Sequence, residues 1–373
     1  MRMYSVIGFL IVLFAGCTKA LELPDTRPDT SILVVEGDIR TGPQTENRIR
    51  LSRLKPLFQF DDVPERNARV EIVAQSGSRW PLADKKNGDY ASILQLPDNV
   101  PLALRIQTAD GKIYETPFQN SVIAPAVDSV TWRQESDGVR VFVHSKDPGN
   151  KTKYYRWTYS ETWERRAWYY SLYDFKNGSI VERPASDQVY TCWKSEDEQN
   201  ILVNNTEELG QDLISYQPVS FIPNQSEKLY VRYSIIVRQT GLTKEAYDYW
   251  QILKKNTELT GSIFDAQPSQ MPTNIACTND KSRVAIGYIS VGRVSEKRLF
   301  VLHSSLNLWP IRNEQQGCDA FEYPRFFAER FLQQNTNYLP AYFVTAGGGF
   351  GVAPKSCVDC RLTGGDTVKP DFW

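Results

Sequence analysis

An aromatic segment near the middle of the chain constrains the fold more than any other feature. Residues 153–175 read KYYRWTYSETWERRAWYYSLYDF, and ten of these 23 residues are Phe, Trp or Tyr. With a period of two, Tyr155, Trp157, Tyr159 and Glu161 share one face. Aromatic and β-branched residues suit a pleated, half-buried surface. The segment therefore predicts a long central strand, followed by an aromatic loop or a second strand.

Two interpretations of these aromatic rings remain open from the sequence. In the first, the rings fill the core of a β-sandwich. In the second, Trp163, Trp168, Tyr169 and Tyr170 form an exposed patch that docks a protein partner or a glycan. Rigid aromatic side chains commonly anchor interfaces, so these four residues are the candidate contact residues.

The segment before residue 121 alternates short strand-like runs with turn signals. Ser31–Ile39, Ala68–Ala74 and Leu102–Thr108 are rich in β-branched and aliphatic residues, and Asn87-Gly88 marks a tight turn between two strands. Strands of this length with regularly spaced turns are typical of a β-sandwich. Residues 31–121 are therefore expected to form a first sandwich, whose strand order is similar to transthyretin-like and carboxypeptidase-regulatory-like modules.

Residues 122–373 are expected to form a larger immunoglobulin-like or fibronectin-like β domain with a C-terminal tail that contains cysteines. One helix interrupts it over residues 242–257, where Ala246, Tyr249, Ile252 and Leu253 form an apolar stripe at helical spacing. The fold class predicted is thus mainly β, a tandem β-sandwich with one inserted helix.

The N-terminus has the form of a secretory signal. A charged residue, Arg2, precedes a short apolar run, and Phe14-Ala15-Gly16-Cys17 resembles the lipobox of bacterial lipoproteins. The apolar run is too short to span a bilayer. We expect residues 1–16 to be removed, Cys17 to carry acyl chains such as palmitate, and residues 17–30 to form a tether. An ordinary secretory signal is the alternative.

Five cysteines follow Cys17, namely Cys192, Cys277, Cys318, Cys357 and Cys360. An extracytoplasmic compartment permits disulfides, and two bridges with one free thiol is the simplest pairing of an odd number. Sequence alone does not choose among the possible pairings. Cys357 and Cys360 form a CxxC motif, for which structural bridging is favoured over a redox or a metal-binding role.

The charge balance argues against a nucleic-acid partner. The whole chain has 43 basic and 44 acidic side chains, and loss of Arg2 with the leader leaves a net charge of −2. Nucleic-acid binding requires a basic surface. The sequence also lacks the GxSxG, HExxH and Walker patterns of common enzymes. We therefore expect no catalytic residues, no metal and no cofactor.

Several motifs together resemble one known family. They are VVEGDIRTG, YYRWTYSETW, the segment AYDYWQILKKNTELTGSIFDAQPS, AIGYISV and the tail CVDCRLTGGDTVKPDFW. These segments, spread over residues 20–373, resemble the domain-of-unknown-function family DUF4249. The resemblance implies a lipoprotein of Bacteroidota-type bacteria, similar in setting to the accessory lipoproteins of TonB-dependent transporters. It implies no catalytic residues.

The functional expectation follows from the anchor and from this resemblance. We expect a non-enzymatic protein, held on the outer membrane by lipid on Cys17, that partners a TonB-dependent β-barrel in nutrient capture. The sequence leaves open whether the protein faces the periplasm or the cell surface. A free-standing glycan-binding or adhesive module is the alternative, and a hydrolase with two acidic residues is a weaker one.

Overall fold

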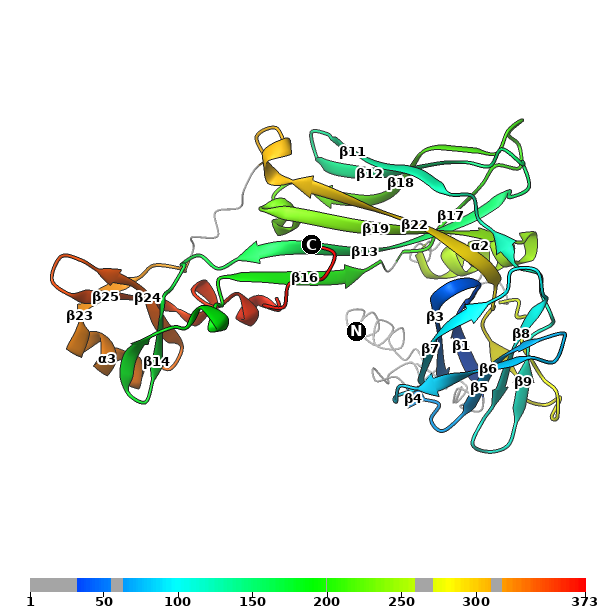
Figure 1. Ribbon diagram of the computed structural model, residues 1–373, viewed down its shortest axis with the longest axis horizontal. Helices are drawn as coiled ribbons and strands as arrows, with labels where there is room; N and C mark the ends of the chain where they lie inside the picture. Colours follow the sequence, from blue (N-terminus) through cyan, green and yellow to red (C-terminus); the bar gives the residue numbers. More distant parts are fainter. Residues whose placement is uncertain (1–31, 55–62, 199, 259–270, 310–316) are drawn as a thin grey trace, which may run out of the picture.

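The computed structural model describes residues 32–54, 63–198, 200–258, 271–309 and 317–373. They form three β-rich units along the long axis of the molecule (Figure 1). We call them the first unit, the central sandwich and the distal unit. Cys17 and the segment GSIFDAQPS, on which part of the family resemblance rests, lie outside the described residues. The mainly β fold predicted from the sequence is confirmed.

The central sandwich is built around the aromatic strand. β13 (Tyr154–Arg166) lies in a seven-stranded sheet between β19 and β16, and a three-stranded sheet covers one face. Tyr155, Trp157, Tyr159 and Glu161 all point into the buried layer between the sheets, as their period of two predicts. The larger sheet contains β2 (Ile39–Arg40), β10 (Val122–Ile123), β13, β16 (Thr191–Asp197), β17 (Leu202–Asn205), β19 (Arg232–Leu242) and β22 (Val291–Leu302). The smaller sheet contains β11 (Val127–Gln134), β12 (Gly138–Lys146) and β18 (Leu213–Pro223).

The distal unit has a small core of its own. It comprises the hairpin of β14 (Tyr173–Lys176) and β15 (Ser179–Glu182), the sheet of β23 (Phe321–Pro324), β25 (Gly349–Pro354) and β24 (Tyr338–Val344), and helix α3 (Arg325–Gln334). Ile180, Ala328, Leu332, Phe350 and Val352 form the core between these elements. Residues 122–373 therefore do not pack around a single core, whereas the sequence led us to expect one larger domain.

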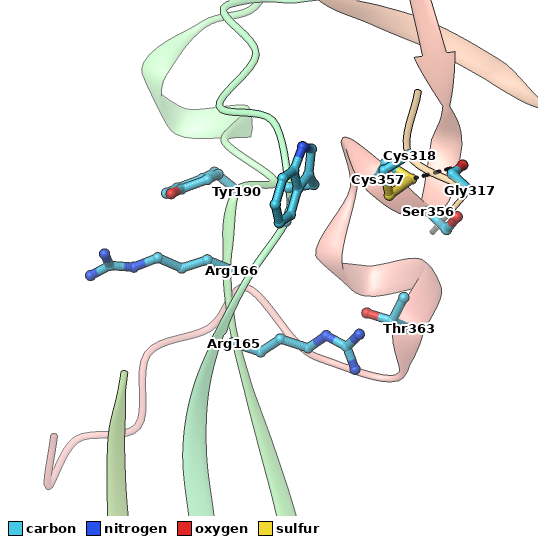
Figure 2. A pocket seen from close by; sticks show the side chains of 10 residues that line it. Arg165, Arg166, Tyr190, Gly317, Cys318, Ser356, Cys357 and Thr363 are labelled. Atoms are coloured by element: carbon cyan, nitrogen blue, oxygen red, sulfur yellow. Dashed lines mark hydrogen bonds between the residues drawn. A yellow bond between two sulfur atoms is a disulfide. The ribbon is translucent and has the colours of Figure 1, made fainter. Parts of the chain in front are cut away.

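Two disulfides hold the C-terminal segment, one to the central sandwich and one to the start of the distal unit. Cys192 on β16 bonds Cys360, and Cys318 before β23 bonds Cys357. The second of these bridges is visible in Figure 2. Each cysteine of the CxxC motif thus pairs with a distant segment, and Cys277 is a buried free thiol.

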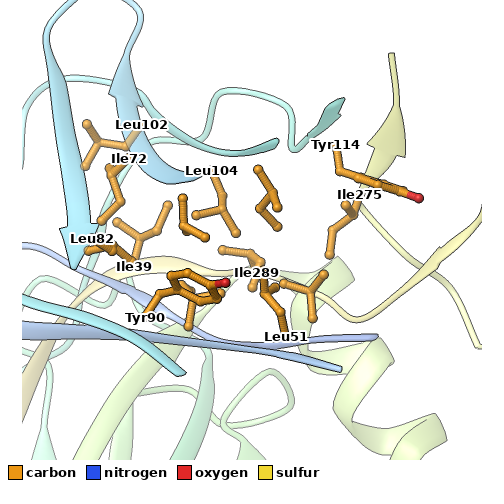
Figure 3. Packing of buried hydrophobic residues seen from close by; sticks show 14 of the residues in the cluster. Ile39, Leu51, Ile72, Leu82, Tyr90, Leu102, Leu104, Tyr114, Ile275 and Ile289 are labelled. Carbon is orange, nitrogen blue, oxygen red and sulfur yellow. The ribbon is translucent and has the colours of Figure 1, made fainter. Parts of the chain in front are cut away.

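The first unit is one ten-stranded sheet folded over its own core. Its strands are β1 (Leu33–Gly37), β3 (Gly42–Arg53), β4 (Val63–Pro64), β5 (Arg69–Ala74), β6 (Arg79–Asp84), β7 (Asp89–Leu96), β8 (Leu102–Gln107), β9 (Ile113–Glu115), β20 (Ala276–Cys277) and β21 (Ala285–Ile286). Side chains from the two halves of the sheet, such as Ile72 and Leu104 against Leu51 and Tyr90, meet in the core (Figure 3). β20 and β21 come from the later part of the chain, so this unit extends beyond the expected residues 31–121.

The first unit and the central sandwich share backbone pairing. β2 follows β1 directly and pairs with β22 of the central sheet. Arg156 of β13 forms an ion pair with Asp38 at 2.9 Å and stacks on Trp250 of helix α2 (Lys244–Glu258). These links fix the first unit against the sandwich. In the part of the chain that the structure describes, no helix has the length and apolar content needed to cross a bilayer.

Candidate functional site

A cavity of about 640 Å³ lies where the central sandwich meets the distal unit. We call it the junction cavity (Figure 2). Four separate stretches of chain form its wall. The lining residues are Arg165, Arg166, Ala167, Trp168, Tyr190, Gly317, Cys318, Ser356, Cys357 and Thr363.

The end of β13 supplies the aromatic part of this wall. β13 stops at Arg166, Ala167 remains buried, and Trp168 leaves the sheet with 46% of its surface exposed. Tyr170, 57% exposed, packs its ring at a right angle against Tyr190, with 5.1 Å between centroids. Trp168 therefore presents an indole to solvent beside a pair of tyrosine rings.

Two arginines at the end of β13 point in opposite directions. Consecutive strand residues point to opposite faces, and in Figure 2 Arg165 extends toward the segment that carries Thr363, whereas Arg166 extends away from it. Arg165 pairs with Glu227 at 2.6 Å, and Arg166 pairs with Glu164 at 2.8 Å. A guanidinium has five N–H donors, so one carboxylate leaves donors available for a ligand or a partner.

The C-terminal wall is held by the disulfides and by a buried acid between them. Asp359 lies between Cys357 and Cys360 and accepts hydrogen bonds from the backbone N–H and the guanidinium of Arg361. Burial alone would raise the pKa of Asp359, but the hydrogen bonds from Arg361 outweigh it and hold the pKa below its ordinary value. Asp359 is therefore ionised at neutral pH and fixes the turn between the two bridges.

A second buried acid stabilises the sheet next to the cavity. Glu161 accepts hydrogen bonds from Tyr233 at 2.5 Å and Ser220 at 3.0 Å, and pairs with Lys228 at 2.5 Å. Burial opposes the charge on Lys228, but its ion pairs with Glu161 and Glu196 outweigh this and raise its pKa. Ser220 lies on β18 and Tyr233 on β19, so the carboxylate of Glu161 connects β13 to both sheets of the sandwich.

The structure separates the four candidate contact residues. Trp163 is only 1% exposed and belongs to the sandwich core, so its assignment to an exposed patch is wrong. The reason is that β13 continues to Arg166, which keeps Trp163 on the same inward face as Trp157. Trp168 and Tyr170 are exposed, as the second interpretation requires.

Tyr169, the fourth candidate contact residue, is half-buried and does not belong to an exposed patch. Its hydroxyl donates to the carbonyl of Cys318 at 2.8 Å, and its ring packs against Tyr342 at 5.6 Å between centroids. The half-buried Tyr169 therefore joins β13 to the distal unit, and the exposed surface rests on Trp168 and Tyr170.

Most of the cavity wall could not be predicted from the sequence. Tyr190, Cys318, Ser356 and Thr363 are distant from Trp168 in the chain, and only the fold brings them together. The one available clue was the odd number of cysteines together with the CxxC motif, which indicated disulfides near the C-terminus but not which cysteines they join.

The junction cavity combines exposed aromatic rings, guanidinium groups and hydroxyls. Such a surface is suited to recognition by stacking and hydrogen bonding.

Comparisons with known proteins identify a family for this chain, but they do not identify an activity. The family model described as "Domain of unknown function (DUF4249)" matches residues 19–298, which ends within β22. Comparison with curated proteins found no match. A two-domain fibronectin type III segment of chicken tenascin is 9% identical and covers 55% of this chain and 90% of its own, at a TM-score of 0.16. A TM-score this low does not establish a shared fold.

Proposed function

The chain belongs to the DUF4249 family, and we propose that it is a non-enzymatic, lipid-anchored binding protein of the outer membrane. In this proposal, Cys17 carries the lipid and the protein partners a TonB-dependent β-barrel in the capture or presentation of a nutrient. The family description names no function. The binding role and the anchor are proposed from this chain's own residues, and the barrel partner from the resemblance described in the sequence analysis.

The junction cavity is the observation that carries the proposal. Tryptophan, tyrosine and arginine dominate the energetics of protein interfaces, and Trp168, Tyr170, Tyr190, Arg165 and Arg166 gather at this one place. Two disulfides and the ion pair of Asp359 hold the wall in position. A preformed surface loses less conformational entropy when a partner binds, so this site is suited to docking.

The lipobox supports the anchored part of the proposal. Several acyl chains on Cys17 give durable attachment, whereas one chain gives only reversible binding. Metabolic labelling with a palmitate analogue tests this step. We expect label in the wild-type protein and none in Cys17→Ser, and an unlabelled wild-type protein would contradict the anchor.

A growth experiment tests the role in transport. A strain that lacks the protein should grow poorly on a nutrient whose uptake needs the proposed partner barrel, and wild-type protein should restore growth. Normal growth of the deletion strain on every such nutrient would count against the proposal.

Glycan binding is the second candidate function, and the exposure of Trp168 favours it. An exposed indole beside hydroxyl and guanidinium donors can stack on a sugar ring while the donors bind its hydroxyls. A broad glycan array probed with the unacylated protein should then show hits that Trp168→Ala removes. An array without hits would remove this candidate.

A further inference from the structure

Helix α3 of the distal unit exposes two adjacent aromatic rings. It buries Ala328 and Leu332 in the distal core, and leaves Phe326 and Phe327 exposed to 68% and 56%. Their rings contact each other edge to face, with 5.6 Å between centroids. Contiguous exposed apolar surface of this kind marks an interaction site more often than a scattered single residue does.

The charge next to these rings is positive. Arg330 lies four residues after Phe326 and three after Phe327, so it shares their face one turn further along α3, and it is exposed. Glu329 is the helix's acidic residue, and it accepts hydrogen bonds from Arg325 and from the backbone N–H of Ile180. The outward face of α3 therefore combines two apolar rings with the guanidinium of Arg330. The carboxylate of Glu329 is already hydrogen-bonded to Arg325 and Ile180.

Helix α3 and the first unit, at which the proposed anchor enters, are placed alike relative to the central sandwich. The first unit and the distal unit with α3 both lie on the same side of the central sandwich (Figure 1). The described chain enters the first unit at β1. Fourteen residues lie between Cys17 and Ile32, and even fully extended this segment spans only about 50 Å. A lipid on Cys17 therefore keeps the start of the first unit within about 50 Å of the bilayer, and a second contact on the same side of the sandwich is needed to fix the orientation.

We propose that the outward face of α3 is a second membrane contact, in which Phe326 and Phe327 enter the headgroup region of a bilayer that contains anionic phospholipid. Arg330 pairs there with lipid phosphates, since basic side chains next to apolar ones strengthen binding to anionic membranes. This inference rests on the proposed lipid anchor at Cys17. Anchor and helix together hold both ends of the molecule to the bilayer and fix the orientation of the junction cavity.

Vesicle flotation tests this contact without the lipid anchor. The probe is the chain that begins at residue 18, which keeps every described residue, mixed with phosphatidylethanolamine vesicles that contain phosphatidylglycerol. We expect it to float with these vesicles and to float less with pure phosphatidylcholine. Phe326→Ser with Phe327→Ser should lower the bound fraction about tenfold or more, because the transfer of two aromatic rings is lost. Arg330→Gln should weaken binding only to the anionic vesicles.

Matched variants separate this effect from a folding defect. Phe221→Ser removes an exposed ring from β18, in the sheet on the opposite side of the sandwich from α3 (Figure 1), and should float like wild type. Phe326→Trp with Phe327→Trp should keep binding. Circular dichroism and intact disulfides establish that each variant is folded.

Two results would overturn the contact. One is a wild-type chain that does not float with anionic vesicles, and the other is a serine variant that floats as well as wild type. Loss of a copurifying barrel in the serine variant, with vesicle binding unchanged, would make α3 a protein-docking face instead. Failure of the proposed function is detected by different experiments. Metabolic labelling would then find no lipid on Cys17, or copurification would find no barrel partner.

Discussion

At the scale of single residues, two tryptophans five positions apart have opposite roles. Trp163 is buried in the sandwich core, and Trp168 faces solvent at the junction cavity. Trp163→Ala should lower the free energy of unfolding of the central sandwich by about 3–5 kcal/mol, because a large core side chain is lost. Trp168→Ala should change it by roughly 0.5 kcal/mol or less, as is usual for surface positions.

Chemical denaturation followed by far-ultraviolet circular dichroism compares these two variants without relying on tryptophan fluorescence. Equal destabilisation by both substitutions would contradict the assignment of Trp163 to the core and Trp168 to the surface.

Asp359 makes the C-terminal wall of the junction cavity sensitive to acid. Its pKa is lowered in the folded protein, so its contribution to stability is complete above the unfolded pKa of about 4 and is lost as the pH falls through the folded value. Asp359→Asn should therefore cost up to about 1 kcal/mol at neutral pH, since Arg361 loses its charged partner. At acidic pH the variant and the wild type should become equally stable.

Thermal unfolding of both proteins across a pH series measures this difference. A difference that stays constant from neutral to acidic pH would show that the charge of Asp359 is not the cause.

At the scale of elements, local patterns predicted what local forces determine. The period of two in residues 153–163 identified β13, and the apolar stripe over residues 242–257 identified α2, observed over Lys244–Glu258. The pairing of β20 with β9 could not be predicted from the sequence, because Ala276 and Glu115 are distant in the chain and β20 has only two residues. Trp163 was misplaced because the sequence did not reveal that β13 continues beyond it.

The two disulfides should contribute unequally to the junction. Cys192–Cys360 joins the C-terminal segment to the central sheet, whereas Cys318–Cys357 closes a shorter loop within and beside the distal unit. Replacing Cys192 and Cys360 by serine should release the segment after residue 355 from the sandwich and expose it to protease. Replacing Cys318 and Cys357 should instead loosen the chain before β23.

Limited proteolysis with mass mapping of the first cut sites distinguishes the two variants. The same first cut in both would show that the bridges stabilise one common unit and do not hold separate segments.

At the scale of the whole molecule, the central sandwich and the distal unit together create a site that no single segment contains. The junction cavity combines the end of β13, Tyr190, the approach to β23 and the C-terminal turns. From the sequence, Trp168 and Tyr170 could be named as contact residues, since they follow the aromatic strand. The arginines, the hydroxyls and the disulfide partners could not, because their proximity depends on how the distal unit sits on the sandwich.

The measurement that tests the central claim most directly is extraction of the tagged, acylated protein from its native membrane in mild detergent, followed by mass spectrometry of the copurifying proteins. We predict a TonB-dependent barrel in stoichiometric amount, reduced at least several-fold by Trp168→Ala with Tyr170→Ala. Tyr216→Ala, which removes an equally exposed ring on β18, serves as the matched control and should leave the barrel in place. A lone lipoprotein without a barrel would contradict the account.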